Sequence, residues 1–161
     1  MYFYKYINTF FSIIILLIMY YDYDSSLYTL NRTTISSTLF ATNIIHLYSK
    51  NDNWYFYSFI ILLFTSILYH QTKNTNIGIA DKLCVANIIC RGGTNILIYS
   101  TYDLYTVIVI IGFFSASWLY NYGYITKQYI FNENETIGNN YHMLLHLISS
   151  ISHHIIIYKI N

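Results

Sequence analysis

The stretch NWYFYSFIILLFTSILYHQT, residues 53–72, has no charged side chain over twenty positions. Asp52 precedes it and Lys73 follows it, so a charge stands at each end. A helix needs about 20 consecutive apolar residues to cross a bilayer, and a charge near the middle of the bilayer is costly. The stretch therefore predicts a membrane-spanning helix, and the rest of the chain can be compared with it.

The whole chain is poor in charge. Charged residues make up 9% of its 161 residues, whereas hydrophobic residues make up 55% and aromatic residues 20%. An ordinary soluble domain has about 25% charged residues, so we expect this chain to lie in a lipid bilayer. The net charge of +1 gives no basic surface of the kind that binds nucleic acid.

Windows with few or no charges mark six candidate spans, which we expect to form one integral membrane domain over residues 1–161. The predicted fold is all-α, a multi-pass bundle of about six transmembrane helices, with a range of five to seven. The first window has no small-residue cleavage site after it, so it is interpreted as a retained anchor. The six windows are Tyr6–Tyr21, Thr33–Ser49, Asn53–Thr72, Ile77–Tyr99, Leu104–Thr126 and Thr136–Tyr158.

Ionisable residues inside such windows are candidates for function, because they are costly in lipid. Ser66 and His70 are four residues apart, so they share one face near the end of the third window. Asp81 follows across a short polar turn, and His142 and His146 lie one turn apart in the last window. Because successive spans alternate in direction, all five side chains are expected at one end of the bundle.

Three imidazoles are a known ligand set for catalytic zinc, which keeps a fourth position for water. Such a water loses its proton near neutral pH and attacks a carbonyl carbon. We predict His70, His142 and His146 as zinc ligands and Asp81 as general base. Ser66 is predicted to donate to the developing oxyanion or to orient a ligand. At the edge of a membrane the substrate would be a lipid amide or ester.

The order Ser-x3-His, Asp, His-x3-His on the last helix resembles the alkaline ceramidase superfamily. This group includes the ceramidases, the lipid-remodelling proteins that act after GPI attachment, the progestin and adipoQ receptors, and haemolysin III-type proteins. Ser66-Ile-Leu-Tyr-His70 is similar to the haemolysin III and receptor version, and the eleven-residue step to Asp81 is similar to the ceramidase and GPI-remodelling branches. His142-x3-His146 also resembles the GPI-remodelling pattern.

The resemblance covers residues 53–90 and 141–158. It implies that the three motif histidines bind zinc, that Asp81 holds the zinc-bound water, and that the protein is a membrane hydrolase. The family has seven spans, with three between the helix that carries the Asp and the last one. This chain has one predicted span between those two helices, so the resemblance implies a shortened member of the superfamily.

Two other interpretations remain open. In the first, a non-catalytic membrane protein keeps the zinc site as a structural pin or receptor switch. In the second, a plain membrane-anchored structural protein binds no metal. Among the remaining residues, His46 and His154 are expected at the membrane interface and His153 in the interior. Arg91, with the two glycines after it, is expected at a helix end or a close packing point.

Overall fold

The computed structural model describes residues 32–99 and 103–160, and this part of the chain is all-helical, as predicted. The predicted first span, Tyr6–Tyr21, lies outside the described residues. In chain order the elements are α2 (Arg32–Ser37), α3 (Leu39–Leu47), α4 (Asn53–Thr72), α5 (Thr75–Tyr99), α6 (Leu104–Ser117), the π-helical turn η1 (Trp118–Tyr122), α7 (Gly123–Thr126), the 3-10 turn η2 (Tyr129–Phe131) and α8 (Glu135–Lys159).

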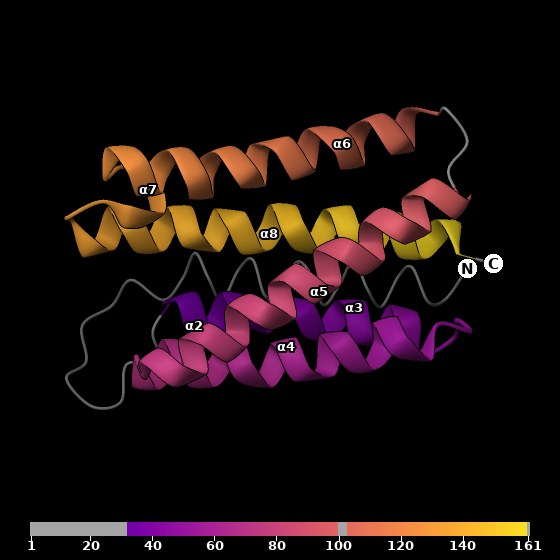
Figure 1. The fold of residues 1–161 in the computed structure, drawn as a ribbon, viewed down its shortest axis with the longest axis horizontal. Coiled ribbons are helices and arrows are strands. Elements are labelled where there is room, and N and C mark those ends of the chain that lie inside the picture. The colour runs from indigo at the N-terminus through magenta and orange to yellow at the C-terminus, as the bar shows by residue number, and fades with distance from the viewer. Residues whose placement is uncertain (1–31, 100–102, 161) are drawn as a thin grey trace.

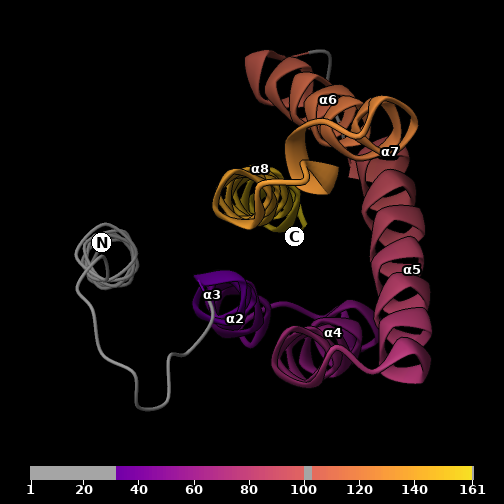
Figure 2. The ribbon, with the colours of Figure 1, turned by 90° about the vertical axis from the view of Figure 1, so that its left-hand side faces the viewer.

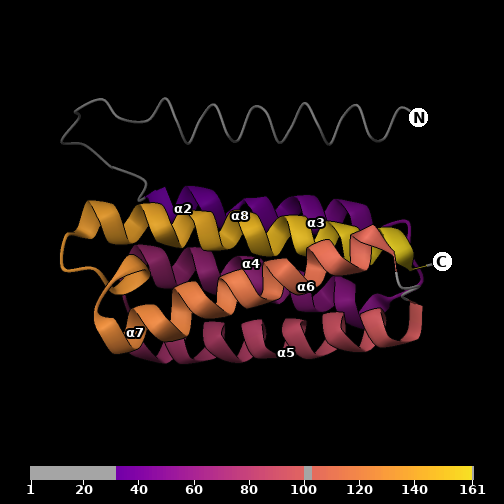
Figure 3. The same cartoon turned by 90° about the horizontal axis from the view of Figure 1, so that it is seen from above.

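Helix α8 lies between α6 and α7 on one side and α2 and α3 on the other (Figures 1 and 2). Helices α4 and α5 are antiparallel neighbours, joined by a short turn after Thr72. The C-terminal end of α4 and the N-terminal ends of α5 and α8 lie at the same end of the molecule (Figures 1 and 3). This arrangement places residues from three distant parts of the sequence near one another.

The window of residues 33–49 does not form one continuous helix, because α2 ends at Ser37 and α3 begins at Leu39. The hydroxyl groups of Ser36 and Ser37 both donate to the backbone carbonyl of Thr33, each at 2.9 Å. Serine side chains that bond to nearby backbone groups compete with regular helix formation. The break itself lies at Thr38, whose backbone N–H and hydroxyl both bond to the carbonyl of Ile35, three residues back.

The apolar core lies where α3, α4, α5 and α8 meet. Its buried side chains include Phe40, Leu47, Tyr55, Phe59, Leu62, Ile88, Ile156 and Ile157. Gly92 lets α5 approach closely, since a Cβ atom there would lie 3.0 Å from His153 Cε1 and 3.1 Å from the Tyr55 hydroxyl. A larger residue at this position would push α5 away from α4 and α8.

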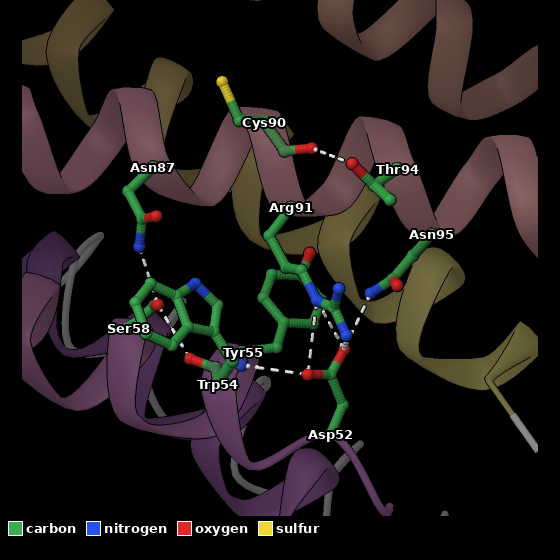
Figure 4. Close-up of polar contacts among 9 residues, drawn as sticks. All are labelled: Asp52, Trp54, Tyr55, Ser58, Asn87, Cys90, Arg91, Thr94 and Asn95. Atoms are coloured by element: carbon green, nitrogen blue, oxygen red, sulfur yellow. Dashed lines mark hydrogen bonds and ion pairs between the residues drawn. The ribbon is translucent and has the colours of Figure 1, made fainter.

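A buried carboxylate ties the start of α4 to the middle of α5 (Figure 4). The Asp52 side chain is 5% exposed and caps α4 by accepting a hydrogen bond from the backbone N–H of Tyr55 at 3.1 Å. Its other oxygen accepts from Arg91 Nε at 2.9 Å and from Asn95 Nδ2 at 3.0 Å. The sequence predicted a helix end or a close packing point at Arg91 and the two glycines after it. The helix end is wrong, because α5 continues to Tyr99, whereas the close packing is confirmed at Gly92. Arg91 itself forms the ion pair with Asp52.

The prediction of a six-span bundle is wrong. Among residues 32–99 and 103–160, one helical stretch, Leu104–Phe131, is long and apolar enough to cross a membrane, with 28 residues and a mean hydropathy of 1.5. Helices α2 and α3 have only six and nine residues. Helix α5 carries Asp81, Lys82 and Arg91, and α8 carries four histidines. Charge-poor windows located the helices, but the polar side chains within them lower the hydropathy, so a multi-pass arrangement is not supported.

Large apolar side chains nevertheless lie on the outside of several helices. Phe64 on α4 is 63% exposed, Leu97 on α5 is 86% exposed, and Phe114 on α6 is 66% exposed. Only 22% of the most apolar window within Leu104–Phe131 is buried against the rest of the described chain. This stretch therefore presents most of its apolar side chains outward rather than to the core.

Candidate metal centre

Three histidines from two helices converge at the end of the molecule where α4 finishes and α8 begins. His70 lies on α4, and His142 and His146 lie one turn apart on α8. One ligand atom from each lies within 4.8 Å of the other two. The ring centroids are 4.6 Å apart for His70 and His142, 4.7 Å for His142 and His146, and 5.5 Å for His70 and His146.

These separations suit a shared metal ion. Zinc binds imidazole nitrogen at about 2.0–2.1 Å, so two nitrogens on one tetrahedral ion are about 3.4 Å apart. Side-chain movements of roughly 1 Å would bring the three nitrogens to that spacing. The group His70, His142 and His146 could therefore hold a metal ion, as the sequence predicted.

The protonation of the three rings also favours metal binding. Burial, assisted by the neighbouring His142 and Lys73, lowers the pKa of His70 to about 3. Burial likewise lowers the pKa of His142 to about 4 and holds that of His146 well below its usual range. Since a histidine must be neutral to ligate a metal, all three rings are in the binding form at neutral pH.

His70 supplies a second reason to expect an ion. Its side chain is 3% exposed, and among the described residues its buried Nε2 atom has no hydrogen-bond partner. A buried polar atom without a partner costs about 1–3 kcal/mol. A metal ion between the three rings would satisfy this nitrogen, so the donor set fits zinc both in chemistry and in number.

Two serines of α2 contact the site, and sequence reasoning missed both. Ser36 Oγ lies 2.8 Å from His146 Nδ1, and Ser37 Oγ lies 2.9 Å from Ser66 Oγ. Because Ser37 donates its hydrogen to a backbone carbonyl, Ser66 is the donor in the bond between the two serines. In this geometry the Ser66 hydrogen is directed to Ser37 rather than to an oxyanion or to one of the three histidines. The only signal in the sequence is the polar character of the window of residues 33–49, in which the serine pair lies.

Asp81 lies on α5 and is not a member of the metal-binding group found among the described residues. It accepts a hydrogen bond from Thr65 Oγ1 at 3.3 Å, so it meets α4 one residue before Ser66. Burial raises the pKa of Asp81 to about 6, although Thr65 and Lys82 act in the opposite direction. A carboxylate with this pKa is ionised at neutral pH and can accept a proton there.

The remaining histidines form a second set nearer the other end of α8. His154 Nε2 lies 2.7 Å from Thr42 Oγ1, and His154 Nδ1 lies 3.0 Å from His46 Nδ1. The rings of His46 and His154 stack between α3 and α8. The sequence predicted instead that both histidines would lie at the membrane interface. His153 is buried and hydrogen-bonded to the Tyr55 hydroxyl, in keeping with an interior histidine.

Comparison with known proteins gives no match, whether to family models, to curated proteins or to solved structures. The function of the chain must therefore be inferred from the geometry of its own residues. The resemblance to the alkaline ceramidase superfamily stays a prediction carried by Ser66, His70, Asp81, His142 and His146.

Proposed function

We propose that this chain is a zinc-dependent hydrolase that cleaves amide or ester bonds of lipids. The observation that supports it most is the group of three neutral histidines, of which His70 and His146 are buried and His142 is half-buried. Within residues 32–99 and 103–160 the group has three imidazoles and no fourth protein ligand, which is the pattern of catalytic rather than structural zinc. Structural zinc usually has four protein ligands, so the small donor set favours chemistry at this site.

The proposed roles of the other predicted site residues suit hydrolysis. Zinc, held by the three imidazoles, would supply the polarisation of a water molecule for attack on a carbonyl carbon. Asp81, whose pKa burial raises to about 6, takes the proton that the attacking water loses and returns it to the leaving amine or alcohol. Ser66 donates to Ser37 and so holds α2 against the face of α4 that carries His70.

A lipid substrate is favoured by the exposed apolar surface of this chain. Large apolar side chains lie on the outside of α4, α5 and α6, where Phe64 is 63% exposed, Leu97 86% and Phe114 66%. The outward-facing apolar stretch Leu104–Phe131 would keep the protein close to lipid.

A second candidate function is a metal pin without catalysis. The three histidines join α4 to α8, two helices that are far apart in the sequence, and a metal there would stabilise the fold by itself. Asp81 is not among the ligands, so such a pin would not need it. The two functions therefore differ in what they require of Asp81.

The proposed activity can be tested with the purified full chain and two probes, a fluorescent lipid amide and a fluorescent lipid ester. We expect hydrolysis of at least one probe, loss of hydrolysis after treatment with a chelator, and recovery on addition of zinc but not of magnesium. His142→Ala/His146→Ala should be inactive under all three conditions. His153→Ala is the matched control, because it removes a buried histidine of the same helix outside the metal group. Hydrolysis that persists without metal, or none in the zinc-loaded protein, would contradict the proposal.

A further inference from the structure

Ser36 contacts both a metal-ligand candidate and its own backbone. Its side chain is fully buried, and its Oγ lies 2.8 Å from His146 Nδ1. The same oxygen lies 2.9 Å from the carbonyl oxygen of Thr33 in a hydrogen bond that Ser36 donates. The serine therefore bridges α8 to the last turn of α2.

The directions of these two hydrogen bonds follow from the number of hydrogens. A serine hydroxyl has one hydrogen, and a backbone carbonyl can only accept. Both bonds can form at once only if Ser36 gives its hydrogen to Thr33 and accepts from His146. That arrangement requires a hydrogen on His146 Nδ1.

A neutral imidazole carries one ring hydrogen, so a hydrogen on Nδ1 leaves Nε2 with a free lone pair. Nδ1 of His146 is already engaged by α2, and Nε2 is the nitrogen left for the group that it forms with His70 and His142. The opposite tautomer would place a hydrogen between the ring and the metal position, and binding would first require that hydrogen to move.

We infer that Ser36 is a positioning residue that holds His146 in the tautomer with hydrogen on Nδ1, so that Nε2 is presented to a divalent metal ion. This inference rests on the proposed metal site and adds the group that orients one of its ligands. Hydrogen-bond partners of metal-ligating histidines fix the ring and its tautomer, and their loss commonly weakens metal binding by about 10- to 100-fold. The Ser36–Thr33 bond within α2 also fixes the direction of the bond to His146.

The test uses the full-length chain in two measurements. Nitrogen-15 NMR of the histidine rings in metal-free protein reports the tautomer of His146, which should carry hydrogen on Nδ1 in the wild type and lose that preference in Ser36→Ala. Titration with zinc against a competing chelator should show about 10- to 100-fold weaker binding in Ser36→Ala. Ser150→Ala is the matched control, since it removes another fully buried hydroxyl between α8 and α3 without contact to a histidine. Its zinc affinity and His146 tautomer should equal those of the wild type.

Two results would overturn the inference. One is a His146 ring with hydrogen on Nε2 in the wild type, and the other is equal zinc affinity in Ser36→Ala and Ser150→Ala. If none of the three proteins bound zinc, the tautomer alone would decide the role of Ser36. An Nδ1 hydrogen that depends on Ser36 would then support the positioning role while the proposed zinc function failed.

Discussion

Asp81→Asn is expected to lower the rate of lipid hydrolysis by about 10²- to 10⁴-fold, the usual contribution of a general base, while zinc content stays unchanged. Asparagine has nearly the same shape as aspartate and can still accept the hydrogen bond from Thr65, but it cannot take a proton. Since Asp81 is not in the group of three histidines, its replacement leaves the metal ligands intact. The measurement is kcat on the lipid probes together with metal analysis of each protein.

The pH profile gives an independent check on the same residue. The pKa of Asp81 is about 6, so protonation removes the base and the wild-type rate should fall as pH decreases through about 6. This decrease should be absent from the residual rate of Asp81→Asn.

Asp103→Asn is a suitable control for Asp81→Asn, because Asp103 also accepts a hydrogen bond from a threonine, Thr106, but at the start of α6. It should retain wild-type kcat. If Asp81→Asn also retained wild-type kcat, the metal would be a structural pin and Asp81 would have no part in catalysis.

Asp52→Ala should lower the free energy of unfolding by about 4 kcal/mol. Removing one partner of a buried ion pair costs about 3–5 kcal/mol, and the lower end applies because Arg91 is 34% exposed and can recover some contact with water. Loss of the cap on α4 adds about 1 kcal/mol. Denaturant unfolding followed by far-ultraviolet circular dichroism would measure the change.

Asp52→Ser separates the two contributions to this loss. Serine is as good a helix cap as aspartate, but it has no charge to pair with Arg91. We therefore expect Asp52→Ser to lose about 3 kcal/mol, roughly 1 kcal/mol less than Asp52→Ala. A loss below about 1 kcal/mol in both variants would mean that the ion pair contributes nothing to folding.

The positions of the helices could be predicted from the sequence because charges and polar turns bound them. The window Asn53–Thr72 is identical to α4, and the window Thr136–Tyr158 differs from α8 by one residue at each end. The break between α2 and α3 was not predicted, because it depends on local hydrogen bonds at Thr38. A charge-free window shows where a helix can lie, but not whether that helix is apolar enough to cross a membrane. This distinction explains why six spans were predicted and one candidate was found among the residues that the structure describes.

The candidate site was predictable to the extent that it depends on spacing along a helix. The four-residue step from His142 to His146 sets a shared face, and the order of the helices brings His70 to the same end. Contacts between distant helices were not predictable, because no local pattern specifies them. Ser36 and His146 are 110 residues apart, and Asp52 and Arg91 are 39 residues apart. Both pairs became evident only from the packing of the helices.

The most direct test of the central claim is elemental analysis of the purified full chain after zinc is supplied and unbound metal is removed, with His142→Ala/His146→Ala prepared in parallel. The account predicts about one zinc per wild-type chain and essentially none in the double variant, since two of its three ligands are lost. A wild-type protein that contains no zinc after this treatment would contradict the account, and the three histidines would then be a buried polar cluster without metal.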